Sequence, residues 1–346
     1  MGQISYTMKN MLNVLFYAAA AFVFSAGAEA VLLPMLRKLK AGQAIREDGP
    51  QAHLAKAGTP TMGGIAMVFA VPAALLLGLA LRIGFVSNVY AKPEALQRAC
   101  LHLLGPALVM LAYGAIGFVD DFIKVTKKHN EGLTPKQKLA LQILAALIFA
   151  VTEAKGGKAM IFPFVGRFVM PAWLAIPFEV FVIVAMTNAV NLTDGLDGLA
   201  SSVTAVCSAF FAFVLSAVSG SASFNAAAIC GACLGFLVFN HYPAKVFMGD
   251  TGSLALGGGL AAMAASAGAE WFLPIAGLVY VAEALSVIIQ VYVFKTQNGR
   301  RFFRMAPLHH HFELGGWKET KVVWMFVLAA AVSCLVALAG FSVAFA

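Results

Sequence analysis

Charged residues are scarce in this chain of 346 residues, where they make up 12% of the sequence. An average soluble domain contains about 25% charged residues. Hydrophobic residues reach 61%, the mean hydropathy is +0.84, and no segment has the composition of a separate soluble module. These features exclude an ordinary soluble protein and predict one integral membrane domain covering residues 1–346.

Other absences narrow the class of protein further. The five cysteines lie in or beside apolar stretches, so the Cys230-Gly-Ala-Cys233 spacing is read as core packing and not as a metal or redox site. The phosphate-loop pattern GxxxxGK[ST] is missing, as is a dinucleotide fingerprint. The net charge of +8 reflects basic loops between apolar stretches, so no nucleic-acid partner is expected.

Long apolar stretches are abundant, and crossing a bilayer takes roughly 20 residues. The sequence predicts an all-α polytopic protein with about ten transmembrane helices. The expected spans are 11–34, 62–84, 101–119, 137–152, 173–190, 200–218, 224–239, 253–268, 271–294 and 322–346. Loops after odd-numbered spans hold 17 of the 24 lysines and arginines, which predicts that these loops are cytoplasmic and both termini are outside. A short external hairpin is expected around residues 161–169.

The polar residues are distributed unevenly between the two sides. All six aspartates, and six of the seven histidines, fall in the loops after odd-numbered spans. Carboxylates, histidines and lysines gathered on one face favour a site for a metal and phosphates. A pore lining would instead place polar groups inside the spans, so the active site is expected on the cytoplasmic face.

Two motifs contain closely spaced carboxylates. Asp120 and Asp121 end the third span, and Lys124 shares a helical face with them. Paired carboxylates suit divalent-metal binding or proton abstraction, although a charged helix end is the alternative. The second motif is Asn188-Ala-Val-Asn-Leu-Thr-Asp-Gly-Leu-Asp-Gly-Leu199, in which Asn191 and Asp194 offer the hard oxygen ligands that magnesium uses. Its alternative is an Asn/Asp/Gly turn between helices.

Three further motifs suit a nucleotide and its phosphates. In Asn240-His-Tyr-Pro-Ala-Lys-Val-Phe-Met-Gly-Asp-Thr-Gly-Ser253, Phe247 offers an aromatic face and Asp250 a metal ligand, although a tight turn before a helix is the alternative. Lys56 and Thr61 lie among glycines and offer donors to a phosphate. The run His309-His310-His311 cannot converge on one ion from regular backbone, so we expect phosphate contacts and not a zinc site.

These motifs, in this order, resemble those of the bacterial phospho-N-acetylmuramoyl-pentapeptide transferases, within the polyprenyl-phosphate N-acetylhexosamine-1-phosphate transferase superfamily. The Pro307-Leu-His-His-His-Phe-Glu313 run resembles the muramoyl-pentapeptide branch in particular. The resemblance covers essentially the whole chain. It implies a Mg²⁺-dependent transfer of a phospho-sugar from UDP-N-acetylmuramoyl-pentapeptide to undecaprenyl phosphate. It also implies a bacterial plasma-membrane location and a homodimer.

The resemblance also suggests roles for individual residues. It points to Asp250 as the first metal ligand, beside Asp194 and Asn191. Asp120 is expected to be the base toward the lipid phosphate, with Asp121 and Lys124 positioning it, and His309 is expected to contact the donor diphosphate. Whether the lipid phosphate attacks directly or a phospho-enzyme forms is open at this point. The remaining substrate-binding residues are expected to be Lys56, Thr61, Gly195, Leu196, Asp197, Asn240, Phe247, Gln290, His310 and His311.

Two alternatives have to be considered. One is a UDP-N-acetylglucosamine transferase of the same superfamily. The other is an ion-coupled transporter, because apolar spans joined by polar loops fit both classes, and its candidate charges within the spans are Glu29, Glu179 and Glu283. Transporters place charges near the bilayer midplane on broken helices, and here the candidates are few and scattered.

Overall fold

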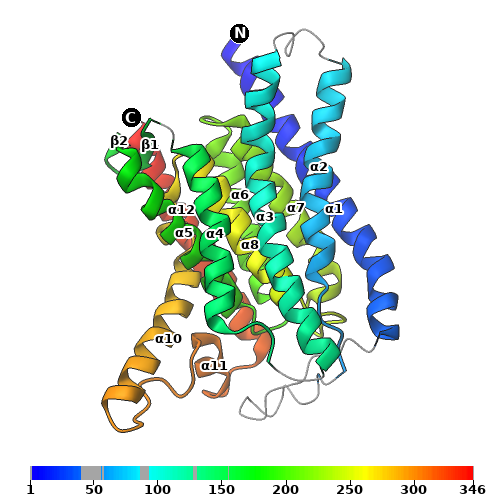
Figure 1. Cartoon of the computed structure of the whole chain (residues 1–346), viewed down its shortest axis with the longest axis vertical. Coiled ribbons are helices and arrows are strands. Elements are labelled where there is room, and N and C mark those ends of the chain that lie inside the picture. The colour runs from blue at the N-terminus through cyan, green and yellow to red at the C-terminus, as the bar shows by residue number, and fades with distance from the viewer. Residues whose placement is uncertain are drawn as a thin grey trace.

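The computed structural model describes residues 2–39, 56, 58–85, 93–127, 131–154 and 156–345. The predicted cytoplasmic residue Asp48 lies outside these ranges. The fold is a bundle of long helices with one small hairpin (Figure 1). The long helices are α1 (Gly2–Lys38), α2 (Gly64–Phe85), α3 (Pro93–Lys127), α4 (Pro135–Glu153), α5 (Ala172–Thr193), α6 (Leu199–Leu215), α7 (Gly220–Asn240), α8 (Gly249–Ser266), α10 (Leu278–Thr296) and α12 (Glu319–Ala344). The short elements are β1 (Lys158–Phe162), β2 (Gly166–Met170), the 3₁₀ helix η2 (Glu270–Phe272), α9 (Leu273–Ala276) and α11 (Leu308–Glu313).

Each predicted span except 271–294 corresponds to a single helix, and the polytopic helical membrane class is confirmed. Within the described ranges, seven helices are long and apolar enough to cross a membrane: α1, α2, α3, α5, α7, α10 and α12. α4, α6 and α8 match three further predicted spans but are not among the seven. The number of ten crossings therefore stays a prediction.

Helix α8 forms the centre of the bundle, and every residue from Thr251 to Ala265 is buried. Its glycines allow this, because a Cβ at Gly258 would contact the Tyr113 ring of α3 and one at Gly257 would contact the Thr187 backbone of α5. Close helix packing by small residues is common in membrane proteins. The glycine run of α8 therefore serves close helix packing.

Two details of the sequence prediction were wrong. The predicted span 271–294 is not continuous, because η2 and α9 precede α10 and Gly277 separates α9 from α10. The prediction that all aspartates lie in loops is also wrong, since α3 continues past residue 119 and carries Asp120 and Asp121, and Asp250 lies in the first turn of α8. A helix satisfies its own backbone hydrogen bonds, so it can extend beyond its apolar stretch when its charged side chains find partners.

The two ends of the bundle differ in what they carry. Both chain termini lie at the end that also holds the β1–β2 hairpin, and α11 lies at the opposite end (Figure 1). The hairpin pairs Lys158 with Met170 and Phe162 with Gly166, so the predicted hairpin is confirmed. At the α11 end, Thr134 caps α4 by accepting from the Gln137 backbone N–H, and the Gln137 side chain accepts from Thr134 in return.

Candidate active site

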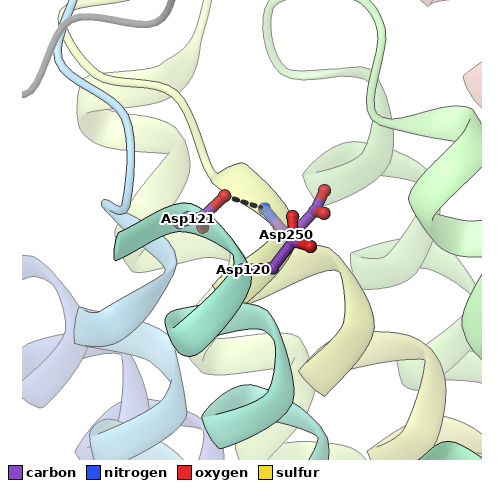
Figure 2. Close-up of side chains that lie close together, drawn as sticks. All are labelled: Asp120, Asp121 and Asp250. Carbon is purple, nitrogen blue, oxygen red and sulfur yellow. Dashed lines mark hydrogen bonds between the residues drawn. The ribbon is translucent and has the colours of Figure 1, made fainter. Parts of the chain in front are cut away.

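Three carboxylates converge at the α11 end of the bundle. Asp120 and Asp121 come from the C-terminal part of α3 and Asp250 from the first turn of α8 (Figure 2). One oxygen from each lies within 4.8 Å of the others. Asp120 and Asp121 are buried and the Asp250 side chain is 17% exposed, so the cluster opens to solvent at Asp250.

Asp121 joins α3 to the N-terminus of α8. Its Oδ2 accepts the backbone N–H of Thr251 at 2.9 Å and the Thr251 hydroxyl at 2.7 Å, and its Oδ1 accepts the Asp250 N–H at 3.2 Å (Figure 2). Unpaired N–H groups and the dipole at a helix N-terminus favour such a carboxylate. The two helices approach closely because Gly117 has no side chain, and a Cβ there would collide with the Asp250 carbonyl.

Two lysines bridge the other two carboxylates. Lys124 Nζ lies 2.6 Å from Asp120 Oδ2 and 3.1 Å from Asp250 Oδ2. Lys138, in the first turn of α4, lies 3.2 Å from Asp120 Oδ1 and 2.7 Å from Asp250 Oδ2. The sequence predicts that Lys124 shares a helical face with both α3 carboxylates; in the structure it pairs with Asp120, whereas Asp121 accepts hydrogen bonds from Thr251 of α8. Three carboxylates against two lysines leave an excess of acid that favours a bound cation.

Asn191 and Asp194 border this cluster from the end of α5. The Asn191 amide donates to Asp250 Oδ1 at 2.9 Å and to the Ser253 hydroxyl at 2.8 Å, which leaves its own oxygen as the atom for a further ligand. Asp194 follows the last residue of α5. Burial, together with the charges of Asp250, Asp121 and Asp197, raises the pKa of Asp194 to about 8. A nearby cation would relieve this repulsion.

A second polar network includes Lys56 and Asp197, two of the predicted substrate-binding residues. Lys56 Nζ lies 2.7 Å from Asp197 Oδ1 and 2.6 Å from Glu319 Oε1. Glu319, at the start of α12, also accepts the backbone N–H of Asp197 at 2.8 Å. Asp197 Oδ2 accepts the Ala244 N–H at 2.9 Å, so four separate chain segments meet here.

The backbone around Phe247 is held by neighbouring segments. The Phe247 N–H donates to the Pro60 carbonyl at 2.8 Å, and its carbonyl accepts from Gly63 at 2.9 Å. Thr61, which follows Pro60 in the sequence, is buried. Asn240 accepts from the Gly198 N–H and donates to the Val246 carbonyl, which ties the predicted pocket residues together. The Phe247 ring itself is half-buried, while Leu196 is buried.

The three consecutive histidines have different partners. His309 is buried and its Nδ1 lies 3.1 Å from Glu283 Oε1 of α10. His310 Nδ1 lies 3.0 Å from Glu313 Oε2, and His311 Nδ1 accepts the Arg304 N–H. They do not converge on one point, which agrees with the argument against a zinc site.

Gln290 forms hydrogen bonds with the segment between α10 and α11. Its amide oxygen accepts the N–H groups of Phe302 and Phe303, and its nitrogen donates to the Phe303 carbonyl.

Three residues of the site were not predicted from the sequence: Lys138, Glu283 and Glu319. A signal existed for Glu283, because an ionisable residue inside an apolar span is a functional candidate by default.

The predicted metal ligands Asp250, Asp194 and Asn191 overlap only partly with the compact carboxylate cluster. Asp250 belongs to both sets, and Asp120 and Asp121 complete the cluster. All of these groups offer the hard oxygen donors that suit magnesium. The chemistry of the donor set therefore fits a hard divalent cation centred on Asp250.

Comparison with known proteins indicates the family of this chain. The model of "Glycosyl transferase family 4" matches residues 103–268, and "Phospho-N-acetylmuramoyl-pentapeptide-transferase signature 1" matches residues 56–68. A phospho-N-acetylmuramoyl-pentapeptide-transferase of Clostridioides difficile is 45% identical over 325 residues, covering 92% of this chain and 95% of the relative. Relatives of the same name from Acetivibrio thermocellus and Desulforamulus reducens are 46% and 48% identical, over 94% and 90% of both chains. The chain therefore belongs to the phospho-N-acetylmuramoyl-pentapeptide-transferase family.

Proposed function

We propose that this chain transfers the phospho-N-acetylmuramoyl-pentapeptide group from UDP-N-acetylmuramoyl-pentapeptide to undecaprenyl phosphate. The products are lipid I and UMP, and the reaction is the first membrane step of peptidoglycan synthesis. The observation that carries the proposal is the lysine-bridged cluster of Asp120, Asp121 and Asp250 in a chain whose relatives bear this transferase name. A lipid acceptor accounts for a site at the end of membrane helices, and a diphosphate donor accounts for the cations around it.

In the proposed reaction, an oxygen of the lipid phosphate forms a bond to the β-phosphorus of the donor. The bond from that phosphorus to the bridging oxygen breaks, and the bridging oxygen leaves with UMP. Phosphoryl transfer depends mainly on in-line positioning and on neutralising the oxygens that carry charge. Lys124 and Lys138 already lie at the carboxylates and are placed to neutralise the phosphates.

Magnesium is the proposed cofactor, held by Asp250 with Asp194 and Asn191 and bordered by the other cluster carboxylates. When bound, it would neutralise phosphate oxygens and stabilise the leaving group. Asp120 is the proposed base toward the lipid phosphate, with Asp121 and Lys124 positioning it. Asp120 forms ion pairs with Lys124 and Lys138, the two lysines proposed to neutralise the phosphates. These contacts support its proposed place beside the reacting phosphates.

The proposed location is the bacterial plasma membrane, with ten crossings, a cytoplasmic site and external termini. The separation of the termini from the α11 end supports this orientation (Figure 1). So does the excess of lysine and arginine in the loops at the site end. A homodimer remains an expectation from the resemblance.

The test is an assay of the purified full chain in detergent with both substrates, with and without Mg²⁺. Lipid I and UMP are expected in equal amounts, and only with the metal. A UDP-N-acetylglucosamine donor is expected to give no lipid product. Product from that donor alone would refute the proposal in favour of the other transferase, and no lipid I from the muramoyl donor would refute it outright.

A further inference from the structure

Glu283 lies in α10 with no solvent exposure, and both of its oxygens contact α11. Oε2 accepts the backbone N–H of Leu308 at 2.6 Å, and Oε1 lies 3.1 Å from His309 Nδ1. A carboxylate inside an apolar helix is costly unless it has a partner. The Glu283 contacts join a membrane helix to the first of the three histidines.

The opposite side of the His309 ring faces the Asp194 loop. A Cβ at Gly195 would collide with His309 Nε2, so the ring edge lies directly against this glycine. Nε2 is buried and has no hydrogen-bond partner within the described residues. Buried polar atoms in proteins almost always have a partner, so an unpaired one beside a proposed phosphate site points to a missing ligand.

We propose that Glu283 is a positioning residue that holds His309 as a hydrogen-bond donor to the diphosphate of the nucleotide-sugar donor. This proposal rests on the proposed function. An ionised carboxylate only accepts hydrogen bonds, so Glu283 requires the proton on Nδ1 of His309. When a diphosphate arrives beside Gly195, a proton on Nε2 completes a row of alternating charge: carboxylate, imidazolium and phosphate. Charge-assisted hydrogen bonds of this kind are about twice as strong as neutral ones.

The neighbouring histidines show that this arrangement is specific to His309. His311 Nδ1 accepts a backbone N–H from Arg304, which places its own proton on Nε2 without a charged partner. His310 contacts Glu313, three residues away on the same short helix, and its side chain is 16% exposed. His309, by contrast, is paired with a carboxylate from a different helix and is buried. The same sequence motif thus presents three different imidazoles.

The experiment measures equilibrium binding of UDP and of uridine to the purified full chain with Mg²⁺ by calorimetry. Glu283→Gln keeps the side-chain shape and the acceptor for Leu308, but its amide nitrogen faces Nδ1, so His309 loses its carboxylate partner. We expect UDP affinity to fall about tenfold and uridine affinity to stay within about twofold. In a His309→Ala background, Glu283→Gln should have no further effect, because it acts through His309.

Glu29→Gln is the matched control, since Glu29 is another fully buried glutamate and lies in α1. It should leave UDP affinity unchanged. Equal losses of UDP and uridine binding in Glu283→Gln, or additive losses in the double variant, would overturn the proposal.

A second variant tests the proposal in a way that does not depend on correct folding of Glu283→Gln. Gly195→Ala leaves Glu283 intact but displaces Nε2, and the same selective loss of UDP affinity is expected. Retained UDP affinity in Gly195→Ala would overturn the proposal. Formation of lipid I by the unaltered chain is assayed in parallel, so failure of the proposed function is seen separately from failure of this inference.

Discussion

Lys56 Nζ lies 2.6 Å from Glu319 Oε1, which joins the loop before α2 to the first turn of α12. Burial lowers the pKa of Lys56, but hydrogen bonds to Asp197 and Glu319 outweigh it, so the pKa is raised above its usual value. Glu319 also accepts the Asp197 N–H, so it fixes two of the predicted substrate-binding residues, Lys56 and Asp197. The last helix thereby contributes to a site whose other parts come from the loop before α2 and from the segment between α5 and α6.

Glu319→Gln is expected to raise the Michaelis constant for the nucleotide donor about tenfold while changing turnover little, because it removes one charge-assisted contact from a binding pocket. It also lowers the pKa of Lys56. Since Lys56 is charged only below its pKa, the alkaline limb of activity should move to lower pH. Steady-state kinetics across pH measures both effects. Thr320→Ala, at the exposed neighbouring position, is the control, and an unchanged Michaelis constant in Glu319→Gln would contradict the role.

Asp250→Asn is expected to lower turnover at least a hundredfold, on the order of 3 kcal/mol of barrier. The Asp250 carboxylate forms ion pairs with Lys124 and Lys138 and accepts a hydrogen bond from the Asn191 amide. It is also the proposed first ligand of the metal. The measurement is lipid I formation over a Mg²⁺ titration. Ser253→Ala removes the other acceptor of the Asn191 amide and should retain most activity. Near-normal turnover of Asp250→Asn in magnesium would remove Asp250 from the metal site.

Phe247→Ala is expected to weaken donor or uridine-type inhibitor binding roughly tenfold to hundredfold, since a base–aromatic stack contributes about 1–3 kcal/mol. Its backbone hydrogen bonds to Pro60 and Gly63 do not depend on the side chain, so the local fold should persist. Inhibitor titration measures the effect. Phe213→Ala, at an exposed position of α6, serves as the control. Unchanged inhibitor affinity would place the base elsewhere.

Much of the site could be predicted because its motifs are local. Asn191, Asp194 and Asp197 lie in one short segment, and the apolar spans on either side place that segment at a membrane boundary. The predicted spans locate the helices because hydropathy alone determines which segments can enter a bilayer. The hairpin near residue 161 follows from its proline and glycine turn signals.

The partners of these residues could not be predicted, because they depend on packing between distant helices. Lys138 begins α4 and reaches Asp250, which is 112 residues away in sequence. Glu283 is one of three scattered candidate charges for the transporter alternative, and the fold shows it in contact with His309. The break at Gly277 gives no hydropathy signal, since the flanking residues are as apolar as a continuous span. Family membership removes the transporter alternative.

At the hairpin end, Lys158 contacts both Glu179 and Glu270, so one cation serves two buried carboxylates. Burial raises the pKa of Glu270 above its usual value. The folded chain then binds a proton more tightly than the unfolded chain, so stability falls as pH rises from about 4.5 toward the raised pKa. Each unit of that difference corresponds to about 1.4 kcal/mol.

Glu270→Gln removes this titration, so its melting temperature relative to the unaltered chain should increase with pH. Thermal unfolding in detergent between about pH 4.5 and 8 measures the difference. Glu131→Gln, at an exposed position near the other end of the bundle, should show no such trend. A pH-independent difference between Glu270→Gln and the unaltered chain would contradict the assignment.

The final prediction separates direct attack from a two-step route. Asp120 is held by Lys124, Lys138 and the Leu133 N–H, and Asp121 by the N-terminus of α8. Carboxylates restrained in this way suit a base and a positioning group, since a nucleophile would have to leave these partners to reach phosphorus. Donor labelled in its β-phosphate, incubated with the chain and Mg²⁺ but without lipid, should therefore leave no label on the protein and release no stoichiometric UMP. Adding undecaprenyl phosphate should release UMP and lipid I together. A stable phospho-sugar adduct on Asp120, Asp121 or Asp250 would overturn the base role, because the lipid would then attack a covalent intermediate and not the donor itself.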